Sequence, residues 1–224
     1  MPSYTRLGMA ALLPNRDISL SDSYEVLVDG QSCVDLAQRQ NILQSNDPNS
    51  CCIQFDELAA MKGAAFKNFF TGKHLIYVYH NQIDARGDKA ITEHEVFNAC
   101  EEGISEIISL VQKIAGGGNT YRFIVTADHG FLYRRDTLAE SDKIGSIKDK
   151  NAFKNRRFVI AEDALIDDGV DNFQLGKSIG NDDTRVVSFP ISHNVFKASG
   201  GLNYVHGGSS PQELLIPVID IKMD

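Results

Sequence analysis

Residues 74–80 read HLIYVYH and residues 121–127 read YRFIVTA, two nearly continuous apolar runs. Runs of this length are typical of β-strands that are covered on both faces. Between them, apolar residues recur at helical spacing over residues 96–111. Thr92, with Glu95 three residues later, has the pattern of a capping box at the start of that helix. Strand, helix and strand in this order predict a right-handed parallel crossover.

This crossover predicts an α/β fold for the whole chain. We expect a three-layer αβα sandwich with a mostly parallel sheet and helices on both faces, formed by residues 1–224 as a single domain. Residues 136–183 are charged and Gly-rich and have little helical periodicity. They are predicted to form an inserted subdomain or lid with one strand at residues 157–161. The basic residues of this segment are predicted to lie on a solvated face: Lys148, Lys150, Lys154, Arg156 and Arg157.

The composition excludes several classes of protein. The chain has 224 residues, of which 42% are hydrophobic, and 22 basic against 30 acidic side chains give a formal net charge of −8. This apolar content and the lack of a short repeat exclude a disordered tail, a coiled coil and a collagen-like fibre. The longest apolar runs are strand-sized, whereas a bilayer span needs about 20 apolar residues, so no membrane is expected. An acidic chain does not favour wrapping of nucleic acid, but nucleic acid held by metal ions stays open as a substrate.

The cysteines and the N-terminal segment predict a cytoplasmic protein. Cys33, Cys51, Cys52 and Cys100 include no Cys-x-x-Cys pair, so neither a disulfide framework nor a zinc knuckle is indicated. Free buried thiols are expected instead. The apolar stretch near the N-terminus is short, ends at Pro14 and has no cleavage site after it, which argues against a signal peptide.

Metal-type side chains directly follow both predicted strands. The segment NQIDARGD places Asp84 and Asp88 four residues apart after the first strand, and Asp128 and His129 follow the second. In parallel sheets, ligands bind beyond the carboxyl ends of the strands, so these side chains are expected at one edge of the sheet. Ionisable groups at the mouth of an apolar strand are costly unless they serve a site.

Two further candidates lie in glycine-flanked segments. His206 is in YVHGGSS and Thr5 is in PSYTRLG. Carboxylates and neutral imidazoles each offer a lone pair to a divalent cation. The competing interpretations are a solvated turn for Asp84 and Asp88, a turn cap for His206 and an ordinary turn hydroxyl for Thr5.

Four segments taken together resemble the PglZ family of bacterial phage-exclusion (BREX-type) proteins. They are PSYTRLGMAALLP from residue 2, DARGD from residue 84, TADHGF from residue 126 and HGGSSPQE from residue 206. They occur in the family order and span nearly the whole chain. That family is similar to the wider alkaline phosphatase superfamily, which includes nucleotide phosphodiesterases and cofactor-independent phosphoglycerate mutases.

The resemblance implies a role for each candidate residue. Thr5 matches the superfamily nucleophile that attacks phosphorus, and Asp128 with His129 matches the pair that binds the metal ion beside it. The ligands of a second metal ion match three further residues: Asp84, Asp88 and His206. The usual superfamily pattern has His where this chain has Asp88. The additional carboxylate makes Mn²⁺ or Mg²⁺ more suitable there, without excluding Zn²⁺.

The resemblance also implies an activity. It indicates a metal-dependent phosphohydrolase or phosphodiesterase of phage defence, with two divalent metal ions and a Thr nucleophile. Other phage-defence proteins are the implied partners, and a phosphate ester, a nucleotide or nucleic acid is the implied substrate. The alternative is a non-catalytic scaffold within a multi-protein defence complex. A mutase acting on a phosphorylated sugar acid is disfavoured, because no cluster of Arg and Lys for a second charged group is visible.

The position of Thr5 departs from the superfamily pattern. There, a buried strand ending in a metal-binding Asp precedes the nucleophile by a few dozen residues, whereas here Thr5 is almost the first residue. The resemblance therefore implies an N-terminally truncated domain that lacks the first strand and one metal ligand, with metal binding weakened next to Thr5 and activity reduced or lost. The neighbouring strands would then present an exposed sheet edge through which an oligomer forms.

Overall fold

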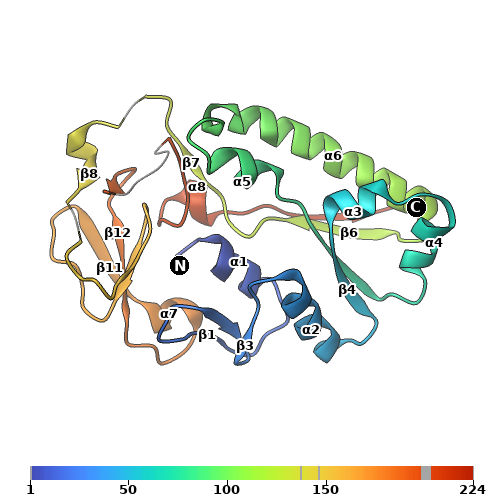
Figure 1. The fold of residues 1–224 in the computed structure, drawn as a ribbon, viewed down its shortest axis with the longest axis horizontal. Coiled ribbons are helices and arrows are strands. Elements are labelled where there is room, and N and C mark those ends of the chain that lie inside the picture. Colours follow the sequence, from blue (N-terminus) through green and yellow to red (C-terminus); the bar gives the residue numbers. More distant parts are fainter. Residues whose placement is uncertain (1, 137, 146, 198–202, 224) are drawn as a thin grey trace.

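The computed structural model describes residues 2–136, 138–145, 147–197 and 203–223 and has a mixed α/β fold (Figure 1). The α-helices are α1 (Thr5–Ala11), α2 (Leu36–Asn46), α3 (Phe55–Ala60), α4 (Gly63–Phe70), α5 (Gln82–Gly87), α6 (Val96–Gly117), α7 (Leu175–Ile179) and α8 (Pro211–Leu214). Two short 3₁₀ helices are η1 (Glu93–Glu95) and η2 (Glu140–Asp142). Among the described residues, no helix combines the length and the apolar character that a membrane span requires.

The strands are short, and most have two to five residues. They are β1 (Ile18–Leu20), β2 (Val26–Val28), β3 (Gln31–Ser32), β4 (Ser50–Gln54), β5 (Leu75–Tyr79), β6 (Arg122–Thr126), β7 (Leu132–Tyr133), β8 (Lys143–Ile144), β9 (Phe153–Lys154), β10 (Val159–Ala161), β11 (Val170–Gln174), β12 (Val186–Pro190), β13 (Val195–Phe196), β14 (Tyr204–Val205) and β15 (Val218–Lys222). Strands β5 and β6 correspond to the two apolar runs that decide the fold class.

The α/β class predicted from the sequence is confirmed, but the sheets are small and mostly antiparallel. Strand β5 pairs in parallel with β4, whereas β6 pairs antiparallel with β15. A four-stranded antiparallel sheet has the order β11-β12-β10-β9, and a three-stranded one the order β1-β2-β3. The prediction of a mostly parallel sheet is therefore wrong, because β5 and β6 take different partners within the described residues.

Strands β4 and β5 lie between two groups of helices, with α6 on one side and α1 and α2 on the other (Figure 1). Successive side chains of a strand point to opposite faces. On one face, alternate side chains of β5 pack with Leu110 and Ile114 of α6, and Phe123 of β6 joins the same cluster. On the other face, Tyr77 and Tyr79 pack against the core that α1 and α2 help to form.

Helix α6 confirms the long helix predicted from the apolar spacing and extends it to Gly117. Its buried residues recur at helical intervals and are Val96, Ala99, Gly103, Leu110 and Ile114. The predicted capping box is wrong. The Thr92 hydroxyl donates instead to the carbonyl oxygen of Arg86 at 2.8 Å, and η1 precedes the first turn of α6. Thr92 lies one 3₁₀ turn before α6, whose N-cap is Glu95, so its hydroxyl does not stand at the start of that helix.

Strand β6 is less covered than its apolar sequence predicts. Ile124 of β6 is 62% exposed, and Ile219 of its partner β15 is 50% exposed. Within the described residues, β5 pairs only with β4 and β6 only with β15, so each keeps one edge without ladder hydrogen bonds. The face of β6 that carries Phe123 packs with the α6 cluster, and the opposite face has no such cover in the described part of the chain. That another chain joins these edges stays a prediction.

The charged segment 136–183 contributes β9, β10 and β11 to a sheet that β12 completes. Strand β10 falls within the strand predicted at residues 157–161. Phe158, just before β10, packs with Tyr4 and Leu7 in the core that contains α1. The segment is therefore anchored to the N-terminal part of the chain. That it closes over a site as a lid stays a prediction.

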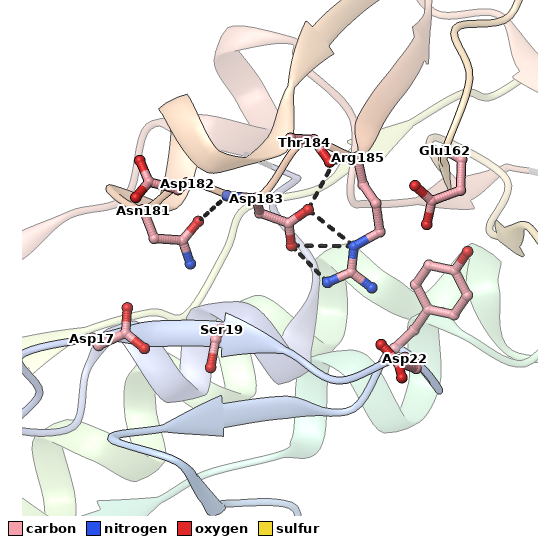
Figure 2. A pocket seen from close by; sticks show the side chains of 10 residues that line it. Asp17, Ser19, Asp22, Glu162, Asn181, Asp182, Asp183, Thr184 and Arg185 are labelled. Carbon is pink, nitrogen blue, oxygen red and sulfur yellow. Dashed lines mark hydrogen bonds and ion pairs between the residues drawn. The ribbon is translucent and has the colours of Figure 1, made fainter.

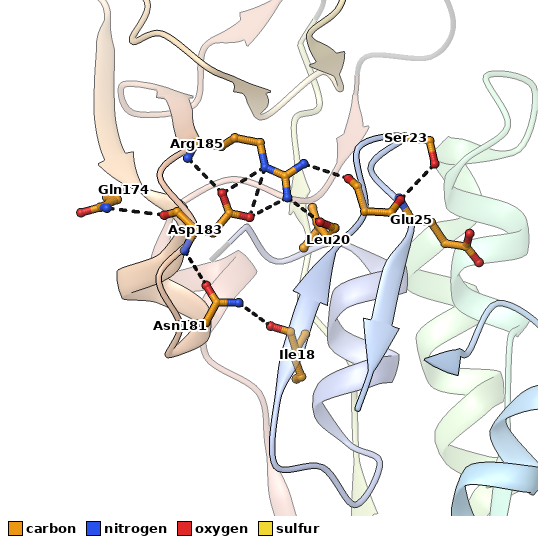
Figure 3. A network of polar contacts seen from close by, with 9 residues as sticks. Ile18, Leu20, Ser23, Glu25, Gln174, Asn181, Asp183 and Arg185 are labelled. Atoms are coloured by element: carbon orange, nitrogen blue, oxygen red, sulfur yellow. Dashed lines mark hydrogen bonds and ion pairs between the residues drawn. The ribbon is translucent and has the colours of Figure 1, made fainter. Parts of the chain in front are cut away.

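Arg185 joins the four-stranded sheet to the hairpin of β1 and β2 (Figure 3). Its guanidinium donates to the backbone oxygen of Leu20 at 2.6 Å and forms an ion pair with Asp183 at 2.6 Å. Asn181 donates to the backbone oxygen of Ile18 at 2.9 Å. The hydrogen bonds from Arg185 lower the pKa of Asp183 below its usual value. Side-chain donors from one sheet thus satisfy backbone acceptors of the other.

We expect Arg185→Met to lower the free energy of unfolding by about 1.5–3 kcal/mol, because hydrogen bonds to a charged group are lost and Asp183 loses the guanidinium that offsets its charge. Chemical denaturation measures this change. Arg122→Met is the matched control, since Arg122 pairs with Asp220 on the exposed surface and its loss should cost below about 1 kcal/mol. Equal losses in both variants would contradict the anchoring role.

The difference between wild type and Arg185→Met should also depend on pH. The pKa of Asp183 is lowered in the folded protein, so the contribution of the pair is present above the ordinary carboxyl pKa of about 4. It is lost as the pH falls through the lowered value. The difference in free energy of unfolding between the two proteins should therefore be largest at neutral pH and become smaller at acidic pH. A difference that does not change with pH would show that another contact, such as the bonds from Arg185 to backbone carbonyls, is responsible.

Candidate metal centre

Asp84, Asp128 and His129 lie together beyond the ends of β5 and β6. Asp84 is in α5, which follows β5, and the other two residues follow β6 directly. Each of the three offers one ligand atom, and these atoms all lie within 4.8 Å of one another. The strand ends therefore converge as the sequence predicts, although the two strands do not pair with each other.

The imidazole of His129 presents one nitrogen to this cluster. Its Nδ1 lies 3.0 Å from the Gly130 carbonyl oxygen, which can only accept, so Nδ1 carries a proton. In the neutral ring, Nε2 then carries a lone pair. Nε2 lies 3.5 Å from Oδ2 of Asp84, 3.6 Å from Oδ2 of Asp128 and 3.1 Å from the Thr5 hydroxyl. This orientation is the one that a metal-ligating histidine needs.

The pKa values of the cluster show how strongly its charges interact. Burial lowers the pKa of His129, but its contacts with Asp84 and Asp128 outweigh burial and raise the value to about 9. Burial raises the pKa of Asp84, but the contacts from His129 and Tyr204 outweigh it and lower the value to about 2. Burial raises the pKa of Asp128, and the charge of Asp84 adds to this. Two carboxylates in a buried space therefore need a positive charge between them.

One oxygen of Asp128 has no donor to satisfy it. Oδ2 of Asp128 is buried and has no hydrogen-bond partner among the described residues. Leaving a buried carboxylate oxygen in this state is costly, and native proteins avoid it unless water or an ion is bound. This oxygen and Nε2 of His129 face the same space, so the donor set fits a divalent cation.

Asp88 and His206 extend the cluster on one side. Nε2 of His206 lies 3.7 Å from Oδ1 of Asp88, and its ring stacks on that of His129 with 4.1 Å between centroids and 1° between planes. Nδ1 of His206 is buried without a hydrogen-bond partner in the described part of the chain. Asp88 is about half exposed and keeps this side open to solvent. All six residues indicated by the sequence thus meet in one region.

Helix α1 brings Thr5 to the cluster by packing its backbone closely against the end of β6. Thr5 is the first residue of α1, and its hydroxyl contacts His129. Gly8, one turn later, touches the backbone of Asp128, and a Cβ at this position would overlap the Asp128 carbonyl. Only a glycine permits this approach, so Gly8 fixes how near Thr5 comes to the cluster.

Tyr204 belongs to the site, but sequence reasoning misses it. Its hydroxyl donates to Oδ1 of Asp84 at 2.5 Å, and its ring packs against Gly87, where a Cβ would overlap it. The residue is fully buried. From the sequence, Tyr204 looks like an ordinary strand residue. Only its position two residues before the candidate ligand His206 could have indicated a role in the site.

The acidic pocket of Figure 2 is separate from this cluster. It has a volume of about 610 Å³, and none of its lining residues is one of the six candidates. It lies between the β1–β2 hairpin and the segment that leads into β12, and four carboxylates without an Arg partner line it: Asp17, Asp22, Glu162 and Asp182. Such a pocket repels phosphate, so it does not compete with the metal cluster as a phosphoryl site.

Comparison with known families identifies the family to which the chain belongs. The family model described as "BREX system PglZ alkaline phosphatase-like domain" matches residues 1–221. The chain belongs to this family. The resemblance indicated by four segments of the sequence is thereby confirmed, and the PglZ domain is assigned to a bacterial defence system by its family description.

Two curated relatives are similar over the entire PglZ domain. The "Alkaline phosphatase-like protein PglZ" of Bacillus cereus (strain H3081.97) is 41% identical over 225 residues, which cover 100% of this chain and 26% of the relative. The "Alkaline phosphatase-like protein BrxZ" of Escherichia coli O9:H4 (strain HS) is 35% identical over 226 residues, covering 99% of this chain and 26% of the relative. The chain therefore spans about a quarter of the length of these relatives.

We expect Tyr204→Phe to weaken binding of Mn²⁺ by about 10-fold or more, because Asp84 loses the hydrogen bond that orients its carboxylate. Titration calorimetry measures the dissociation constant. The change keeps the aromatic ring against Gly87, so folding should be preserved. Tyr121→Phe is the matched control, since that hydroxyl bonds only to the exposed side chain of Asn119. An unchanged dissociation constant in Tyr204→Phe would exclude the orienting role.

Proposed function

We propose that the PglZ domain is a metal-dependent phosphohydrolase or phosphodiesterase in which Thr5 is the nucleophile. One observation carries the proposal. The Thr5 hydroxyl lies 3.1 Å from Nε2 of His129, and that nitrogen also faces the carboxylates of Asp84 and Asp128. A hydroxyl held against a set of metal-type ligands is the arrangement that nucleophilic phosphoryl transfer requires.

The donor set supports two divalent ions. Asp128 and His129 would hold one ion beside Thr5, as the superfamily resemblance implies. The second ion would be held by three residues: Asp84, Asp88 and His206. Three carboxylates and two imidazoles suit Mn²⁺, Mg²⁺ or Zn²⁺. The unpartnered buried oxygen of Asp128 supports this assignment, because a bound cation satisfies it.

The charges of the cluster set the order of events. Three carboxylates in a small space repel a phosphate group, so phosphate binds only after cations have offset them. When bound, divalent ions make the hydroxyl a stronger nucleophile and stabilise charge on the attacking and leaving oxygens. Thr5 would lose its proton to solvent and form a bond to phosphorus, while the leaving oxygen would depart with the electron pair of its bond to phosphorus and take up a proton from solvent. Water then cleaves the phosphothreonine and restores the hydroxyl.

The substrate class follows from the same reasoning and from the family. A phosphate ester or diester is recognised by its phosphoryl oxygens, so a nucleotide or nucleic acid would bind through its phosphate. The net charge of −8 gives the chain no general affinity for nucleic acid, so the ions of the site would have to supply the attraction. The family assignment supports a role in phage defence with other BREX proteins as partners.

A non-catalytic scaffold is the second candidate, and one observation favours it. The open edges of β5 and β6 and the exposed apolar residues nearby form a surface suited to another chain. Ile124, Val218 and Ile219 are each at least half exposed there. Assembly through this edge, as an oligomer or with a defence partner, does not need a metal ion, so a protein that binds no metal would leave only the scaffold.

Metal content is the first test, measured by elemental mass spectrometry on the purified intact protein. We expect stoichiometric divalent metal in the wild type and loss of metal in Asp128→Ala, because Asp128 supplies a buried ligand oxygen. His74→Ala is the matched control, since the side chain of His74 is exposed and pairs with Asp47 away from the cluster. Wild-type protein without metal, even after incubation with Mn²⁺ and Zn²⁺, would exclude the catalytic proposal and favour the scaffold.

Thr5→Ala separates the nucleophile from the metal ligands. We expect this variant to keep its metal but to lose at least about 100-fold in hydrolysis of bis(p-nitrophenyl) phosphate, since the attacking group is absent. Thr71→Ala, at the exposed end of α4, is the control and should hydrolyse the diester like the wild type. Unchanged hydrolysis in Thr5→Ala would point to direct attack by water.

A further inference from the structure

Arg157 and Glu213 form a fully buried ion pair. Both side chains have 0% exposure, and the guanidinium binds the carboxylate through two bonds, Nε to Oε1 at 3.0 Å and Nη2 to Oε2 at 2.8 Å. The sequence predicts that Arg157 lies on a solvated face with its basic neighbours, and this prediction is wrong. Removing two charges from water is costly, so such a pair adds little stability of its own.

The remaining bonding capacity of the pair is used by backbone groups and one hydroxyl of two loops, residues 192–194 and 208–210. Arg157 also donates to the carbonyl oxygens of Ser192, at 2.9 Å, and Asn194. Glu213 accepts from the backbone N–H of Gly208 at 2.9 Å and from the hydroxyl of Ser210 at 2.6 Å. Burial raises the pKa of Glu213, but these bonds and that from Arg157 outweigh it and lower the value. A network satisfied in this way specifies one geometry.

This network reaches the loops that carry the candidate metal ligands. Gly208, held by the Glu213 carboxylate, is two residues after His206. The backbone oxygen of Glu213 accepts from the N–H of Gly130, the residue after His129, at 3.0 Å. Glu213 therefore bonds to the chain next to both stacked imidazoles. The side chain of Glu213 bonds to the loop that carries His206, and its backbone oxygen bonds to the loop that carries His129.

The N-terminal segment is tied to the same point. Ser3 is two residues before Thr5. Its hydroxyl donates to the carbonyl oxygen of Gly208 at 3.1 Å. A Cβ at Gly208 would overlap the side chains of both members of the ion pair, so the loop backbone lies directly on them. The chain next to His206, His129 and Thr5 thus shares one buried anchor.

We propose that Arg157 and Glu213 are positioning residues that hold the His206 loop against His129 and so preform the metal centre. The inference rests on the proposed function, because it gives the ion pair a role in metal binding. It also assigns a role to the segment 136–183, which supplies Arg157. The position of that segment and the affinity for metal are then coupled through a single guanidinium.

A merely structural role makes a different prediction. Replacing a buried ion pair by apolar side chains of similar size is often neutral for stability. Such a replacement leaves the N–H of Gly208 and the hydroxyl of Ser210 without their acceptor. A folded protein with a loosened His206 loop should result. If the pair positions the loop, the folded variant should bind metal more weakly than the wild type. If the pair only supports the fold, the folded variant should bind metal as the wild type does.

The experiment uses the double variant Arg157→Met/Glu213→Leu and the milder Glu213→Gln in the intact protein. The matched control is Arg122→Met/Asp220→Leu, which removes an exposed pair of the same chemistry between β6 and β15. Three quantities are measured: the thermal midpoint, the dissociation constant for Mn²⁺ or Zn²⁺, and the rate at which diethyl pyrocarbonate modifies His206. His74 is the internal reference for this rate, since its side chain is 66% exposed, against 12% for His206.

We expect the double variant to fold with a lower thermal midpoint than the wild type, because groups that now bond to the pair lose their partners. Its metal affinity should fall by about 10-fold or more, and modification of His206 should become faster relative to His74. Glu213→Gln keeps one acceptor oxygen and should be intermediate. The control pair should match the wild type in metal affinity and in modification of His206.

Wild-type affinity together with the wild-type rate at His206 in a folded double variant would overturn the proposal. If the double variant does not fold, Glu213→Gln decides by the same two readouts. If the wild type binds neither Mn²⁺ nor Zn²⁺, the proposed function is excluded, but the rate at which diethyl pyrocarbonate modifies His206 can still be compared. In that case faster modification of His206 in the pair variants still supports positioning, and an unchanged rate rejects it.

Discussion

Charge compensation in a small buried space is the constraint on which the rest of this structure depends. One carboxylate oxygen of Asp84 and one of Asp128 lie near Nε2 of His129, and burial makes every uncompensated charge expensive there. In the protein as described, the proton of His129 is the local positive charge, which is why its pKa rises to about 9. A divalent cation supplies more charge to the same oxygens. Under the proposed function, a bound metal ion would replace this proton.

The fold meets this constraint without one continuous sheet. Strands β5 and β6 end beside each other but pair with β4 and β15, so ladder hydrogen bonds do not fix their relative position. Hydrogen bonds of side chains and close packing fix the relative position of the two strand ends instead. Gly8 seats α1 on the end of β6, and the pair of Arg157 and Glu213 holds the loops that follow β6 and β14. A site assembled from several small sheets depends on such polar anchors more than a site on one sheet does.

The sequence predicts what is local and misses what is not. The apolar runs of β5 and β6 and the spacing of α6 depend on neighbouring residues, and they are where the sequence places them. Asp84 and His129 are identifiable because they follow apolar strands, and Thr5 is identifiable only through the family resemblance of its segment. The antiparallel pairing of β6 with β15 joins segments far apart in the chain, and no short-range pattern encodes it. The burial of Arg157 likewise depends on Glu213, 56 positions away.

The pairing of β6 with β15 has a consequence for how the protein is made. Strand β6 leads into Asp128 and His129, but its only ladder partner in the described residues is β15, which spans Val218–Lys222. The bond from Ser3 to Gly208 likewise closes a loop of 205 positions. Contacts of such high sequence separation form late, because closing long loops costs entropy before the contacts compensate it. On a ribosome, the candidate ligands would be synthesised long before they could meet. In the proposed metal centre, a metal ion would thus bind only after β15 has emerged.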